Sequence, residues 1–201
     1  MTVKINADTS DGLKFVSDTS GAIDFQSNGS TKMSMDSSGN LTCTSMSGIH
    51  KPQIFHVRDE KGTLVHGGSA GANTDNIRVL NTVKTNEITG ASLSSNQITL
   101  PAGTYFCEAF ANGCMVDHHR AFLYNVTDSS VELIGQQYFA TAFSNLGDNT
   151  SMILGRFTIT GQKVFELRHR TQSAKADIGL GHYMNDTRNS VYADVIITRV
   201  A

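Results

Sequence analysis

Histidine and aspartate side chains are the groups in this sequence that could bind a metal ion. The chain contains seven histidines, and the densest group is Asp117, His118 and His119. Adjacent residues of a β-strand point to opposite faces, so His118 and His119 do not easily chelate one ion from a single chain. If three copies of the chain assembled around a threefold axis, one histidine from each copy could bind such an ion. We favour ordinary solvated or hydrogen-bonded histidines, and we expect no metal ion and no cofactor.

Paired acidic and amide side chains are the second group with chemical potential. Asp148-Asn149 and Asn185-Asp186 offer the hard oxygens that calcium prefers, but no calcium-loop spacing surrounds either pair, so we interpret both as turns. Glycan hydrolysis would need two carboxylates held together. The acidic residues are scattered and fall mostly in polar turns, at Asp18, Asp36, Asp128 and Asp148. We therefore expect that the protein is not an enzyme.

Two loops are the best candidates for contact with a partner. Residues 143–149 and 181–186 each join an aromatic or apolar side chain to amide and carboxylate groups. This mixture binds sugars and protein surfaces by stacking and hydrogen bonding. The candidate contact residues are Phe143, Asn145, Asp148, His182, Tyr183 and Asn185. The alternative is that Phe143 and Tyr183 pack beneath their own loops.

Composition and charge argue against several classes of partner. The net charge of −2 and the dispersed basic residues disfavour nucleic acid and acidic membrane surfaces. The sequence has no apolar run that could span a bilayer and no charged-then-apolar N-terminus, so we expect neither membrane insertion nor a signal peptide. Three cysteines indicate a reducing compartment. We favour free buried thiols over a disulfide between Cys107 and Cys114.

An apolar pair recurs every ten residues near the N-terminus. The pairs are Leu13 and Phe15, Ile23 and Phe25, and Met33 and Met35. Polar turn clusters separate them, so each unit predicts a short strand with a narrow apolar face. Such strands from one chain bury too little surface to be stable alone. We expect three chains to share a common axis with these six side chains in the stem interior; a flexible linker is the alternative.

Short β-type runs separated by turn residues make up the rest of the chain. The run 103–111 can bury nearly every side chain, as in a central strand, and Asn112-Gly113 predicts a hairpin turn. No stretch has a helical period. The sequence therefore predicts an all-β fold, with a trimeric β-repeat stem at residues 1–45, a junction at 46–52 and a jelly-roll β-sandwich head at 53–201.

Three motifs follow one another in the second part of the chain: a Thr-Gly pair, an apolar strand ending in proline, and a Gly-x-Tyr-x-Phe run. They are Thr89-Gly90, Ile98-Thr99-Leu100-Pro101 and Gly103-Thr104-Tyr105-Phe106. Together they resemble the C1q/TNF-like jelly-roll family over residues 53–201, with a departure at Cys107, where phenylalanine is usual. The N-terminal repeats resemble the strand repeats of bacteriophage tail-fibre proteins. The resemblance implies a homotrimer packed through an apolar face, with any binding on loops at its outer end.

The resemblance to tail-fibre repeats leads us to expect a structural virion protein of a tailed bacteriophage. It would be a homotrimeric tail fibre or fibre tip whose head contacts the host surface, and its expected localisation is the virion, assembled in the host cytoplasm. Its partners would be copies of itself, other virion proteins reached through the N-terminal region, and a host surface glycan or protein. One alternative is a trimeric capsid decoration protein. Another is a C1q-like glycan-binding module outside a virion.

Overall fold

The computed structural model describes residues 21–43, 52–141 and 147–200, and these residues contain β-strands but no helix. The chain divides into two compact units, Met1–His50 and Lys51–Ala201. Each unit is described below by itself. The predicted junction and the stem residues Leu13 and Phe15 lie outside the described residues, apart from Pro52.

The N-terminal unit holds a three-stranded antiparallel sheet of β1 (Ile23–Ser27), β2 (Ser30–Met35) and β3 (Leu41–Cys43). Ile23 pairs with Met35 and Phe25 with Met33, so the predicted apolar pairs share one face of the sheet. The turn between β1 and β2 contains Asn28 and Gly29, both with positive φ, as a tight hairpin requires. The second and third copies of the ten-residue repeat therefore fold as strand and turn, as the sequence predicts.

The apolar face of this sheet has no cover within the described part of its own unit. Phe25 is 41% exposed, Met35 is 37% exposed and Leu41 is 60% exposed. A single sheet of short strands is stable only when a second layer packs on its apolar face. The apolar face of the N-terminal sheet is thus suited to packing against a second layer.

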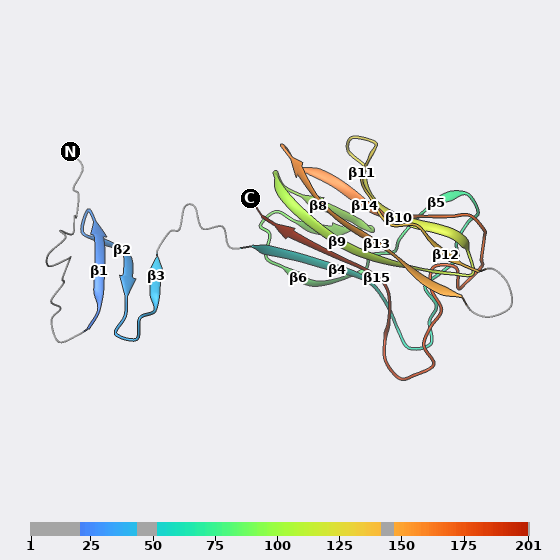
Figure 1. The fold of residues 1–201 in the computed structure, drawn as a ribbon, viewed down its shortest axis with the longest axis horizontal. Helices are drawn as coiled ribbons and strands as arrows, with labels where there is room; N and C mark the ends of the chain where they lie inside the picture. Colours follow the sequence, from blue (N-terminus) through green and yellow to red (C-terminus); the bar gives the residue numbers. More distant parts are fainter. Residues whose placement is uncertain (1–20, 44–51, 142–146, 201) are drawn as a thin grey trace, which may run out of the picture. The chain divides into compact units, whose positions relative to one another are not determined.

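The second unit is a sandwich of two antiparallel sheets, the predicted jelly-roll architecture (Figure 1). The first sheet has five strands in the order β13-β9-β15-β4-β6. They are β4 (Gln53–Lys61), β6 (Thr82–Asn86), β9 (Gly103–Cys114), β13 (Asp148–Ile159) and β15 (Ser190–Arg199). The all-β fold predicted for the head is therefore confirmed.

The second sheet has seven strands, with the central order β11-β10-β14-β8-β7; β12 pairs with β10 and β5 with β14. They are β5 (Thr74–Ile77), β7 (Ser92–Ser94), β8 (Gln97–Leu100), β10 (Asp117–Asn125), β11 (Ser130–Ile134), β12 (Tyr138–Ala140) and β14 (Lys163–Thr171). The core lies between the two sheets.

Strand β9 shows how the sequence places its side chains. Tyr105, Cys107 and Ala109 are 0% exposed and face the core, as their alternation predicts. Phe106 and Phe110 point the other way and are 37% and 36% exposed. The expectation that nearly every residue of this strand is buried is therefore wrong for the outward face of the isolated chain.

The predicted hairpin at Asn112-Gly113 is also wrong. Both residues belong to β9, and the chain turns after Cys114, where Met115 and Asp117 have φ values of 55° and 58°. A Cβ atom on Gly113 would lie 2.9 Å from Nδ1 of His119. This glycine is therefore needed for a close contact between strands rather than for a turn.

One end of the sandwich is held by a buried arginine. Arg78, just after β5, is 0% exposed, and its guanidinium donates hydrogen bonds to the carbonyl oxygens of Asn112 (3.0 Å), Leu180 (2.9 Å) and Tyr192 (2.7 Å). Its Nη2 lies 3.5 Å from Oδ2 of Asp59, which is also fully buried. Arg78 thus ties β4, β9 and β15 to the loop that precedes β15.

Replacing Arg78 by methionine should strongly destabilise the fold, because three carbonyl groups and the Asp59 carboxylate lose their buried partner. Breaking a buried pair of this kind costs about 3–5 kcal/mol of unfolding free energy. Urea unfolding followed by circular dichroism measures the loss, with Arg188→Met, at a side chain 77% exposed, as the control. Equal unfolding midpoints for the two variants would contradict the role given to Arg78.

Candidate functional site

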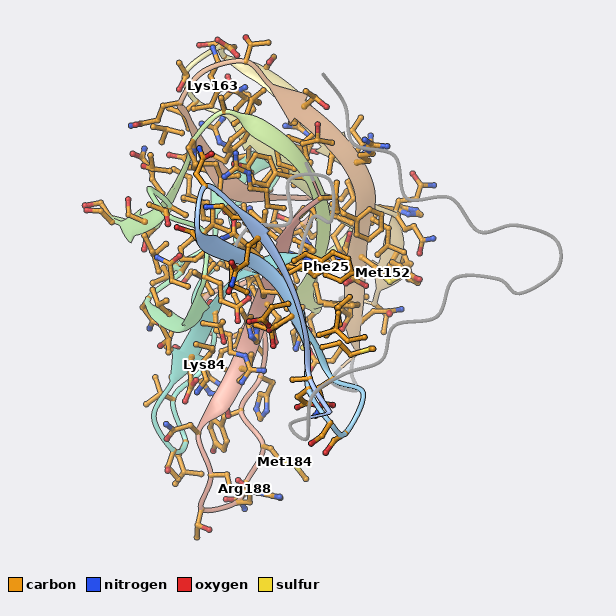
Figure 2. All side chains as sticks on the ribbon, turned by 90° about the vertical axis from the view of Figure 1, so that its left-hand side faces the viewer. Phe25, Lys84, Met152, Lys163, Met184 and Arg188 are labelled. Atoms are coloured by element: carbon orange, nitrogen blue, oxygen red, sulfur yellow. The ribbon has the colours of Figure 1, made fainter. Side chains whose placement is uncertain are left out.

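The outward face of the five-stranded sheet carries a row of apolar side chains near its β13 edge. Phe106 and Phe110 of β9 lie on it, and Leu154 of β13 is 50% exposed. Met152 pairs with Phe110 across the strands and extends the row. Met152 and Lys84 mark the two opposite edges of this sheet, since Met152 lies on β13 and Lys84 on β6 (Figure 2). We call this surface the outward apolar face.

Charged groups of both signs lie on the same face. The Asp194 carboxylate contacts His56 Nε2 and accepts a hydrogen bond of 3.0 Å from Arg58 Nε. Asp194 pairs with Phe110, and Glu108 pairs with Leu154. A hollow of about 200 Å³ lies between Phe110 and Val191. The face therefore combines large apolar side chains, a shallow hollow, and both acidic and basic groups.

The distal end is the end of the sandwich farthest from the paired residues Gln53 and Arg199. Strand β9 finishes there, and the loops 62–73, 115–116 and 172–189 gather there (Figure 1). The termini of the head lie at the other end. The distal end is thus built from loops distant in sequence.

The predicted contact residues at 182–185 lie in a distal loop. The ring of Tyr183 stacks on His66 at a centroid distance of 4.4 Å, and its amide donates to His66 Nδ1 at 3.3 Å. The centroid of the His182 ring lies 4.6 Å from that of His66 and 4.9 Å from that of Tyr183. Tyr183 is therefore half-buried against the loop 62–73 and Asn185 is exposed, and their contact with a partner stays a prediction.

The other predicted contact residues are placed only in part. Asp148 is exposed at the start of β13 and pairs with Cys114. Phe143 and Asn145 lie outside the described residues. The structure therefore brings Asp148 and the 182–185 loop to the same end of the sandwich, and their contact with a partner stays a prediction.

A hollow of about 480 Å³ opens beside the 182–185 loop. It is lined by His182, Met184, Asp186 and Arg188, among others, and Met184 is 68% exposed (Figure 2). The Arg188 amide and guanidinium donate to Asp186 and lower the pKa of its carboxyl group. The charges of this hollow are thus paired within the loop.

A third hollow, of about 320 Å³, lies on the seven-stranded sheet near the distal end. Its lining residues are Asn73, His118, Arg120, Gln137, Arg170 and Gln172, together with two inward-facing residues, His119 and Thr171. Sequence analysis missed this site, because its members become neighbours only through strand pairing. The one available signal was the spacing of His118 with Arg120 and of Arg170 with Gln172, which puts each pair on one strand face.

Buried titratable groups lie beneath this hollow. His119 Nδ1 and His169 Nε2 are 2.9 Å apart, and His169 Nδ1 lies 3.4 Å from Arg78. Burial and the Arg78 charge lower the pKa of His119 to about 4 and hold the pKa of His169 well below its ordinary value. His118, by contrast, is exposed, so the two adjacent histidines face opposite ways as expected.

Within the described residues, no group of three or more histidine, cysteine or acidic side chains is placed to hold a metal ion. Burial raises the pKa of Cys107 and of Cys114 to about 12, and both are free thiols. No described helix is long and apolar enough to cross a membrane.

One serine has the spacing of a hydrolase nucleophile, which sequence analysis also missed. Gly67-Gly68-Ser69-Ala70-Gly71 reads Gly-x-Ser-x-Gly, but a nucleophile elbow needs a strand-to-helix turn, and this segment is a loop. The Ser69 hydroxyl oxygen accepts the Asp177 amide at 2.8 Å. Ser69 therefore has a structural role in the loop.

Comparison with known proteins finds similarity of fold. No protein-family model and no curated protein matches the sequence. Murine APRIL is similar with a TM-score of 0.47 and 9% identity, covering 75% of this chain and 100% of that chain. The globular domain of zebrafish complement 1qA has a TM-score of 0.43 and 10% identity, over 75% and 98%. Eiger TNF from S. frugiperda has a TM-score of 0.47 and 11% identity, over 75% and 94%.

The buried histidines predict that stability falls in mild acid. Their pKa values are lowered in the folded state, so the unfolded chain takes up protons below pH 6.5 that the folded chain does not. The two histidines make their full contribution to the unfolding free energy above pH 6.5, and this contribution is lost as the pH falls toward about 4. Urea unfolding should therefore give a lower unfolding free energy at about pH 5 than at about pH 7.5. His119→Gln should reduce the pH dependence, and His118→Gln should not. A pH-independent unfolding free energy would contradict this.

Proposed function

We propose that this chain is a homotrimeric attachment protein of a tailed-bacteriophage virion. Its heads associate through the outward apolar face and present the distal end to a host surface. The observation that carries the proposal is the row of exposed apolar side chains Phe106, Phe110 and Leu154 on the outward face of the five-stranded sheet. Exposed apolar residues that adjoin one another mark an interaction surface.

The charges on this face favour another copy of the chain as the occupant. Acidic Glu108 and Asp194 lie on the same sheet face as basic Arg58 and Arg156. In a ring of identical copies, different parts of one face meet, so opposite charges can be apposed without a foreign partner. The face thus fits self-association.

The N-terminal unit also has an apolar face that further copies of the chain could cover. Its sheet exposes Phe25, Met35 and Leu41 on one side, which a second layer must cover. Copies of the chain that meet through their heads bring the N-terminal units together, and three such units can enclose their apolar faces around an axis. The assignment to a virion rests on the resemblance of the ten-residue repeats to those of tail fibres.

The mass of the particle tests self-association. Light scattering behind a sizing column should give about three times the chain mass of 21.7 kDa for the full chain. The double variant Phe106→Glu/Phe110→Glu places charges in the packed face and should raise the dissociation concentration at least about tenfold. Ile134→Glu is the control, because Ile134 is 62% exposed on the other sheet. A monomeric native chain, or a double variant equal to the control, would refute the trimer.

Binding to whole particles tests the attachment role. The labelled full chain should bind intact bacteria of a susceptible strain, since an attachment protein displays its distal end in the free trimer. Flow cytometry measures this binding, and purified capsids provide the comparison. Binding to assembled capsids but to no bacterium would overturn attachment in favour of a capsid decoration protein.

A further inference from the structure

Two arginines of the hollow on the seven-stranded sheet lie directly opposite each other. Arg120 of β10 pairs with Arg170 of β14, so both side chains stand on the same face of adjacent strands. Like charges in this position repel each other and destabilise the pair of strands. An anion bound between the two guanidinium groups would remove this repulsion. The strand register itself therefore points to an anionic ligand.

The hollow is short of negative charge. None of its lining residues is acidic, and Arg170 forms an ion pair of 3.0 Å with Asp75. Within the described residues no ion pair engages Arg120. Its five donors stay available to a carboxylate, which guanidinium binds in a two-pronged geometry. The Arg120 guanidinium is thus available to a ligand, whereas the Arg170 guanidinium is held by its ion pair with Asp75.

The rest of the lining supplies groups that recognise sugar hydroxyls. Asn73, Gln137 and Gln172 carry amides that both donate and accept hydrogen bonds. The His118 ring packs edge-on against Phe139 at 4.9 Å, and Phe139 is 52% exposed, so an aromatic surface adjoins the polar hollow. Its volume of about 320 Å³ matches the smaller ligand pockets of proteins. Amides beside aromatic rings favour a saccharide over a bare inorganic anion.

We infer that this hollow binds an acidic saccharide, with the sugar carboxylate between Arg120 and Arg170 and the hydroxyls on the amides. The His118–Phe139 pair forms the apolar wall for the sugar ring. This inference deepens the proposed attachment role and rests on it for its biological meaning, since acidic saccharides are a component class of cell surfaces. The binding itself does not depend on trimer formation.

Isothermal titration of the full chain with three oligosaccharides tests the inference, the probes carrying galacturonate, glucuronate or sialic acid. At least one should bind, and a neutral oligosaccharide of equal length should bind at least about tenfold more weakly. Arg120→Gln and Arg170→Gln should each weaken binding about tenfold or more. Lys163→Gln, which removes a charge at the start of β14, should leave affinity unchanged.

Three results would overturn it. They are no binding of any acidic probe by the folded native chain, equal binding of the neutral probe, or equal competition by inorganic phosphate or an acidic peptide. A chain that binds bacteria but no acidic saccharide would refute this site and leave the attachment role standing. A chain that binds the saccharide but no bacterium would do the reverse.

Discussion

The burial of Arg78 is the constraint on which the distal end depends. A fully buried guanidinium is stable only when carbonyl oxygens and a carboxylate surround it, and here they come from β4, β9, β15 and the loop that precedes β15. Burial lowers the pKa of Arg78 to about 10, so the group stays charged at neutral pH. Burial, together with that charge, lowers the pKa of His169 and of His119 and keeps both side chains neutral. From inside the sandwich, Arg78 therefore holds the distal end of β9 and the loop that precedes β15.

Local patterns in the sequence predicted most of the strands. Alternation in residues 103–111 separated the core side of β9 from its outward side, and the ten-residue spacing identified β1 and β2. These predictions succeeded because each depends on neighbours along one strand. Asn112-Gly113 failed for the opposite reason, since the tight approach of His119 from another strand, rather than a turn, requires that glycine.

Features that depend on strand pairing could not be predicted. Arg78 looks like a surface residue in sequence, because nothing local shows that Asp59 and three carbonyl groups will surround it. The pair of Arg120 and Arg170 likewise exists only through the register of β10 with β14. The predicted contact loop at 182–185 lies at the distal end of the sandwich, where the Tyr183 ring stacks on His66. Candidate sites read from single loops therefore miss surfaces assembled by a sheet.

The two sheets offer different surfaces, an apolar face on one and a basic hollow on the other, and we propose the first for assembly and the second for recognition. The central claim is that identical chains cover the outward apolar face. A structure of the assembled particle by cryo-electron microscopy or crystallography tests it most directly. We expect Phe110 and Leu154 to be buried against neighbouring copies around a threefold axis. Copies joined through the seven-stranded sheet, with Phe110 and Leu154 in solvent, would contradict the account.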